Sequence, residues 1–208
     1  MLFSCTDPKD NPELTTTGKV TFELSHFWGK YDSADRKEFK LNETFYSADR
    51  KDTVKFSLVE YDVQDIAFRS LKGGVWKDNA VHFSVKIGDG GQQSVSLDSV
   101  KSGEYDLVRF YLTNLRINGE RIGSGGNKVI AYDLTAVEND RLFSKETSET
   151  FKVDESASPK IHLDVNIAGI WSGTLDLQKD LEVNGTSKEA ASAASYFASS
   201  WLLERVVP

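Results

Sequence analysis

The sequence predicts an all-β fold, an antiparallel β-sandwich with a single C-terminal helix packed on it. Short segments in which apolar and polar residues alternate follow one another along most of the chain. Clusters of glycine, aspartate, asparagine and serine separate these segments, as is typical of turns between strands. No long helical period interrupts them before the last part of the chain, which argues against an α/β arrangement.

The clearest strand is the segment KVTFELSHFW at Lys19–Trp28. Strand alternation places every second residue on one face, and four of the five side chains on that face are large and apolar. The exception is His26, whose imidazole costs free energy to bury without a partner and can also bind a metal ion. This face therefore either closes a core or lines a site at its rim. It consists of Val20, Phe22, Leu24, His26 and Trp28.

Alternation continues through the middle of the chain with three irregular places. It changes phase after Gln64-Asp65, which indicates a β-bulge or two separate strands. The segment 117–122, which contains Asn-Gly, predicts a hairpin, and the charged segment 136–150 predicts a loop. Between these places we expect strands at 54–63, 81–87, 105–115 and 161–167.

The C-terminal part of the chain has a helical pattern. Thr186 and Glu189 have the spacing of a capping box, in which each side chain bonds to a backbone amide at the start of a helix. The alanine-rich sequence that follows predicts a helix over 187–203 with an apolar stripe. We expect this stripe to pack on the sandwich. It contains Ala190, Ala194, Phe197 and Trp201.

Charge and hydropathy restrict the classes of partner. The formal net charge is −7 at pH 7, which argues against binding to nucleic acid because phosphate neutralisation needs a basic surface. No apolar run approaches the roughly 18 residues that a membrane-spanning helix needs. We therefore expect no nucleic-acid partner, and contact with a membrane only through a lipid anchor.

The candidate anchor is Cys5, the single cysteine of the sequence. Its context, LFSCTD, resembles the end of a bacterial lipoprotein signal, in which the cysteine carries the lipid. The alternative is an unmodified N-terminal cysteine. We expect residues 1–18 to form a lipoprotein-type N-terminus and tether, and 19–208 to form one domain. The expected location is the bacterial periplasm or the outer-membrane surface.

Several segments resemble the MbnP-like family of periplasmic or surface copper-binding proteins. The resemblance lies in the first strand ending at His26, in VKFSLVEYDVQDIAF at 54–68, and in VHFSV and the Gly-Glu-Tyr turn within 81–110. It continues through IHLDVNIAGIWSG at 161–173 and covers most of 19–203. It implies a sandwich that binds copper for acquisition or delivery, with a copper-delivery or membrane transport partner. A weaker likeness is to β-sandwich lipoprotein domains without assigned chemistry.

The resemblance places a histidine at each of the chain's three histidine positions. These are His26, His82 and His162, with His26 and His82 as the principal expected copper ligands. Some relatives also use an oxidised tryptophan two residues before the first histidine, but this chain has Leu24 there, and Trp28 lies after His26 instead. Asp164, next to His162 in alternation, could orient an imidazole.

Alternation complicates a shared metal site, because His26 lies on an apolar strand face and His82 and His162 lie on polar faces. Two function classes therefore stay open. The first is a non-catalytic copper-binding protein, and the alternative is a metal-free surface lipoprotein module that binds a glycan or a protein partner. An enzyme is the third choice, since no nucleophile has a defensible base at a known spacing.

Overall fold

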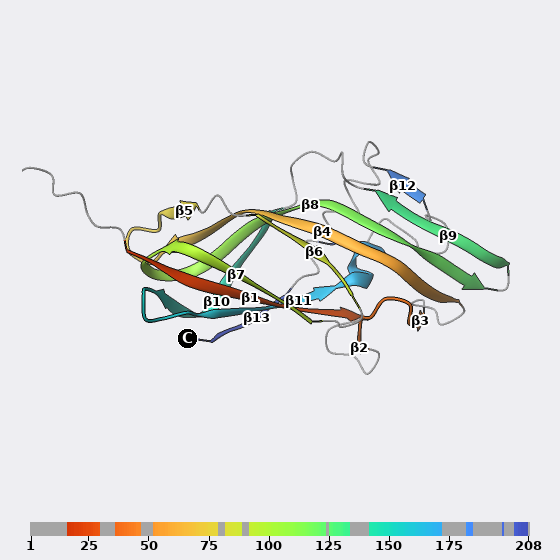
Figure 1. The fold of residues 1–208 in the computed structure, drawn as a ribbon, viewed down its shortest axis with the longest axis horizontal. Helices are drawn as coiled ribbons and strands as arrows, with labels where there is room; N and C mark the ends of the chain where they lie inside the picture. The colour runs from red at the N-terminus through yellow and green to blue at the C-terminus, as the bar shows by residue number, and fades with distance from the viewer. Residues whose placement is uncertain are drawn as a thin grey trace, which may run out of the picture.

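The computed structural model describes residues 16–29, 36–46, 52–78, 82–88, 92–123, 125–133, 142–171, 182–184, 197 and 202–207. Within these ranges the chain forms two β-sheets, one of five strands and one of eight, that pack face to face (Figure 1). Most strand pairs are antiparallel, and the two parallel pairs are β1 with β11 and β9 with β12. The all-β sandwich expected from the sequence is confirmed.

The five-stranded sheet is built around β1. Strand β11 pairs with one edge of β1 in parallel, and β13 continues the sheet beyond β11. The other edge of β1 is shared between β7 and β2, which pair with different halves of it. The bounds are β1 (Thr17–Trp28), β2 (Lys37–Glu38), β7 (Gln92–Lys101), β11 (Lys160–Asn166) and β13 (Leu202–Val207).

The eight-stranded sheet is built around the long antiparallel pair β4 and β8. Strands β3, β5 and β6 pair with β4, strands β9 and β10 pair with β8, and β12 pairs with β9. A 3₁₀ turn, η1 (Ile167–Trp171), follows β11. The bounds are β3 (Thr44–Tyr46), β4 (Thr53–Ser70), β5 (Trp76–Asp78), β6 (Phe83–Lys86), β8 (Gly103–Gly123), β9 (Gly126–Asp133), β10 (Leu142–Val153) and β12 (Glu182–Asn184).

The core lies between the two sheets and is rich in aromatic side chains. The expected inward face of β1 is buried, from Val20 to Trp28. Phe22 lies near its centre, with ring centroids 6.1–6.5 Å from rings on β4, β6 and β8. One cluster of buried residues therefore spans both sheets, and the polar residues of β1 face outward.

The phase change predicted after Gln64-Asp65 is a β-bulge within one strand. Strand β4 runs without a break through these residues, but its register with β8 shifts between Gln64 and Ala67. Asp65 has a positive φ of 51°, a backbone conformation that aspartate tolerates better than most residues. The bulge returns Ile66 and Phe68 to the core, where both are fully buried.

Two segments predicted as turn and loop are strands instead. The hairpin predicted at 117–122 is wrong, because β8 continues to Gly123 and turns only there into β9. The loop predicted at 136–150 is wrong from Leu142 onward, where β10 begins and pairs with β8. Pairing with β4 and β9 supplies the backbone hydrogen bonds of the first segment, and pairing with β8 supplies those of the second.

The helix predicted over 187–203 lies mostly outside the described residues. Leu202 and Leu203, at its predicted end, belong to strand β13, so that end is wrong. Of its apolar stripe the structure describes Phe197, which is buried with its ring 5.7 Å from that of Tyr61. Among the described residues no helix has the length and hydropathy to cross a bilayer.

Gly119 explains why an Asn-Gly pair can occur inside a strand. It lies opposite Phe56 of β4, and a Cβ atom built on Gly119 would lie 3.0 Å from the Phe56 Cα and still closer to the Lys55 carbonyl oxygen. We expect Gly119→Ala to lower the free energy of unfolding by about 2 kcal/mol, because backbone must move to admit the methyl group. Urea unfolding would measure this loss.

Gly125→Ala is the matched control, since a Cβ on Gly125 would meet nothing within 4 Å. Its effect should stay within about 0.5 kcal/mol. Equal stability of the two variants would contradict a close-packing role for Gly119.

Candidate functional site

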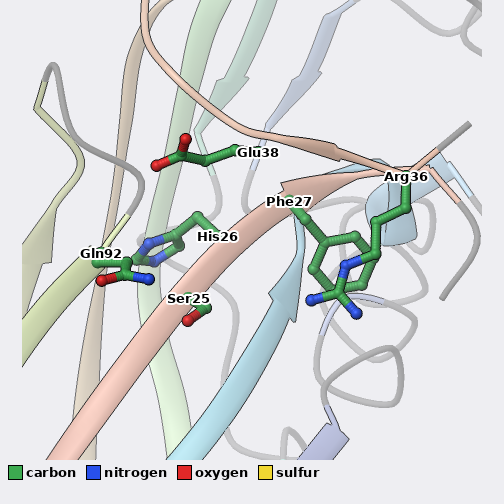
Figure 2. Close-up of a pocket in the computed structure, with 6 residues that line it drawn as sticks. All are labelled: Ser25, His26, Phe27, Arg36, Glu38 and Gln92. Atoms are coloured by element: carbon green, nitrogen blue, oxygen red, sulfur yellow. The ribbon is translucent and has the colours of Figure 1, made fainter.

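A gap in the five-stranded sheet lies beside His26. On one edge of β1, pairing with β7 ends at Ser25 opposite Gln92, and pairing with β2 begins at Phe27 opposite Glu38. His26 is the residue at which the neighbouring strand changes, and its carbonyl oxygen accepts a hydrogen bond from the Phe39 amide at 2.9 Å. A pocket of about 310 Å³ opens there (Figure 2), lined by Ser25, His26, Phe27, Arg36, Glu38 and Gln92.

His26 and Phe27 are the buried members of this pocket, each with 2% of its surface exposed. The His26 Nε2 lies 2.8 Å from the hydroxyl of Tyr61 on β4, so the bond joins the two sheets. Burial raises the pKa of the Tyr61 phenol well above its ordinary value, which keeps this hydroxyl protonated and uncharged. The bond holds the imidazole ring in a fixed orientation from the side of the core.

This bond resembles the way metal-binding histidines are held. A histidine ligand generally bonds through its second ring nitrogen to a neighbouring group, which sets the tautomer and the ring orientation. When the Nε2–H of His26 donates to Tyr61, Nδ1 is the ring nitrogen that carries the lone pair. The core-facing bond is therefore compatible with ligation on the other side of the ring.

The rim of the pocket is polar. Strand register pairs Gln92 with Ser25 and Glu38 with Phe27. Paired residues share a face of the sheet, so Glu38 and Gln92 lie on the outward face, whereas the His26 ring faces the core. Glu38 is half-exposed and forms an ion pair with Lys40 at 3.2 Å. Carboxylate and amide oxygens can bind a divalent ion or hydrogen-bond to a polar ligand.

Asp164 is held by an arginine of the same pocket. Its carboxylate is 2% exposed and accepts a hydrogen bond of 2.8 Å from the Arg36 guanidinium, which also stacks 4.3 Å from the Phe27 ring centre. Asp164 lies opposite Ser25 in the β1–β11 register. The partner seen for Asp164 is thus a cation, where the sequence suggested an imidazole.

His162 lies on the outward face of the five-stranded sheet. It is opposite Glu23 in the register, and its Nδ1 lies 3.1 Å from the Glu23 carboxylate. Lys160 contacts the other oxygen of that carboxylate at 2.8 Å. His162 therefore belongs to a polar cluster on the surface side of the sheet, whereas His26 faces the core.

His82 is exposed and immediately precedes β6. Along β6, Val85 is buried while Ser84 and Lys86 are exposed, so alternation puts His82 on the solvent side of the eight-stranded sheet. The three imidazoles thus lie in three layers, outside one sheet, between the sheets and outside the other. Among the described residues no three His, Cys, Asp or Glu side chains are grouped to hold a metal ion.

Trp28 has a packing role. Its ring lies 5.5 Å from that of Phe45 and 5.4 Å from that of Phe56, and its Nε1 donates to the Tyr46 carbonyl at 2.9 Å. These contacts satisfy the one polar group of a nearly buried indole. Cys5, the expected lipidation site, is outside the described residues.

Sequence reasoning missed Tyr61, Glu38, Gln92 and Arg36. Tyr61 has the same phase as Val59 and Val63, so its pattern is that of an ordinary core residue. Glu38 and Gln92 become neighbours of His26 only through the pairing of β2 and β7 with β1. No local motif marks such residues, because strand register brings them together.

Comparison with known proteins gives one distant structural relative. No protein-family model matches the chain, and no curated protein matches its sequence. Among solved structures the chain is similar to MbnP from Methylosinus trichosporium, with a TM-score of 0.49 and 8% sequence identity. The match covers 84% of this chain and 87% of that one. The relationship is distant and structural.

Proposed function

We propose that the domain binds one copper ion in the pocket at His26, for copper acquisition or delivery, and that it catalyses no reaction. The observation that supports this most is a buried imidazole that is held by Tyr61 and belongs to a residue lining a pocket with a polar rim. Imidazole is a preferred copper ligand, and a ligand held by packing needs little reorganisation on binding.

The rest of the expected ligand set is revised accordingly. Glu38 and Gln92 line the same pocket as His26, and we include their oxygen atoms as further ligands at its rim. We assign His82 and His162 to separate surface positions, where each binds copper more weakly than His26. The proposal also includes a bacterial periplasmic or outer-membrane location, lipidation at Cys5, and a delivery or transport protein that exchanges copper with the domain.

A metal-free binding module is the second candidate. The observation in its favour is the composition of the pocket wall, in which Ser25, Arg36, Glu38 and Gln92 present hydrogen-bonding groups around an opening. Such a wall also suits a sugar hydroxyl or a polar peptide group. In this case His26 and Tyr61 would serve the core alone, and the domain would recognise a glycan or protein partner.

Copper titration separates the two candidates. We expect saturation at about one equivalent, measured with Cu(I) under anaerobic conditions and with Cu(II) in air. Binding should weaken at acid pH, because a proton competes with the metal for the imidazole lone pair. If the protein shows no saturable copper binding at neutral pH, the copper proposal is wrong and the metal-free module is the better candidate. Binding of the protein to immobilised glycans would then test that module.

A further inference from the structure

The turn between β4 and β5 exposes apolar side chains at one end of the molecule. Leu71 is 46% exposed and Val75 is 62% exposed, so both project from a tight turn at 71–74. Gly73 and Gly74 have φ values of +83° and +64°, which glycine adopts without strain. The structure therefore keeps two large apolar groups in solvent on a small projection, which we call the β4–β5 tip (Leu71–Val75).

The β4–β5 tip lies where the described chain begins. The Ser102 amide donates to the Thr16 carbonyl at 2.9 Å, and the Leu71 amide donates to the Glu104 carbonyl, also at 2.9 Å. The short segment 102–104 is thus hydrogen-bonded both to the start of the described chain at Thr16 and to the tip at Leu71. Figure 1 shows β5 and the start of β1 at one end, and the β8–β9 turn at the opposite end.

The side chains around the tip have the character of a membrane interface. Lys72 is exposed, and Lys77 is held beside the tip by a 3.4 Å bond to the Ser102 carbonyl. Trp76 is half-buried under the Arg109 guanidinium, 4.3 Å from its ring centre. Tryptophan with neighbouring lysine and arginine is typical of groups that sit at the headgroup level of a bilayer. Acidic residues also lie at this end: Asp106 is paired with Arg69 and Asp154 with Lys152, while Glu104 and Glu155 are exposed.

We propose that the β4–β5 tip rests in the headgroup region of an anionic lipid bilayer, in addition to the lipid on Cys5. This inference depends on the lipid anchor in the proposed function. Ten residues separate Cys5 from Thr16, and a chain of that length spans at most about 40 Å even when fully extended. An anchor at Cys5 therefore keeps the end that carries the tip close to the bilayer, at a high effective concentration.

A fluorescent label at Leu71 tests the contact. In the lipidated protein Cys5 is blocked, so Leu71→Cys provides the one reactive thiol. The labelled protein is reconstituted in vesicles of phosphatidylglycerol and phosphatidylethanolamine that contain a phospholipid with a spin-labelled acyl chain. We expect the label to emit at shorter wavelength than in buffer and to lose most of its fluorescence by quenching. Charge reversal at Lys72 and Lys77 should reduce both effects.

Val129→Cys is the matched control, since Val129 is 66% exposed on β9, and the β8–β9 turn lies at the opposite end of the molecule. Its label should remain solvent-like and unquenched. Equal signals at the two positions, or quenching at 129 alone, would overturn the proposal.

Mass spectrometry of the acyl group on Cys5 tests the anchor separately. In the unlipidated Leu71→Cys/Cys5→Ser protein, added vesicles should still shift the label, at higher lipid concentration, and no shift at any concentration would count against the tip itself.

Discussion

Replacing His26 with alanine is expected to weaken copper binding by about a hundredfold or more. Loss of a group that only orients a metal ligand generally costs about 10–100-fold in affinity, and loss of the ligand itself should cost at least as much. His82→Ala and His162→Ala should each change the affinity far less, because both residues lie outside the pocket on other faces of the sandwich. Titration of the three variants under the same conditions measures the difference.

Stability must be checked in the same variant, because His26 also bonds to a buried hydroxyl. Removing it leaves the Tyr61 oxygen without this partner, at a cost of about 1–3 kcal/mol in the free energy of unfolding. Tyr61→Phe is the complementary variant, since it keeps the imidazole and removes the bond that orients it. We expect it to bind copper more weakly than the wild type and more tightly than His26→Ala. Wild-type affinity in a folded His26→Ala protein would rule out the site.

Replacing Phe22 with alanine is expected to lower the free energy of unfolding by about 3–5 kcal/mol. Phe22 is fully buried, and its ring contacts the rings of Phe68, Phe83 and Phe110 on three strands of the opposite sheet. Its removal therefore leaves a cavity where the two sheets meet. A loss of this size is a large fraction of the roughly 5–15 kcal/mol that stabilises a typical domain.

Urea denaturation measures this effect through the midpoint of unfolding, provided that the slope is unchanged. Val129→Ala, at a position that is 66% exposed, should change the free energy by less than about 0.5 kcal/mol. A loss below about 1 kcal/mol for Phe22→Ala would mean that the two sheets do not depend on the packing around this ring.

The sequence contained most of the information on the fold and little of the information on the site. Strand alternation at Val20, Phe22 and Leu24 predicts their burial because the period of a strand is local. The phase change at Asp65 predicts the bulge for the same reason. The strand segment at 142–150 could not be predicted in this way, because its polar sequence becomes a strand through pairing with β8.

The site depends on contacts between distant residues. His26 and Tyr61 are 35 positions apart, and each has the phase of a core residue in its own strand. Nothing in either strand shows that the two side chains meet. Alternation predicted that His82 and His162 lie on the polar faces of their strands. Their outward positions agree with that prediction.

The position of β1 has a consequence for how the protein is made. The first strand of the chain pairs with β7, which begins at Gln92, and with β11, which begins at Lys160; β11 in turn pairs with β13 near the C-terminus. Strands whose partners are distant in sequence fold slowly, because a long loop must close before the contact forms. During synthesis, one edge of β1 therefore stays unpaired until β11 has emerged, and an unpaired strand edge is prone to aggregation.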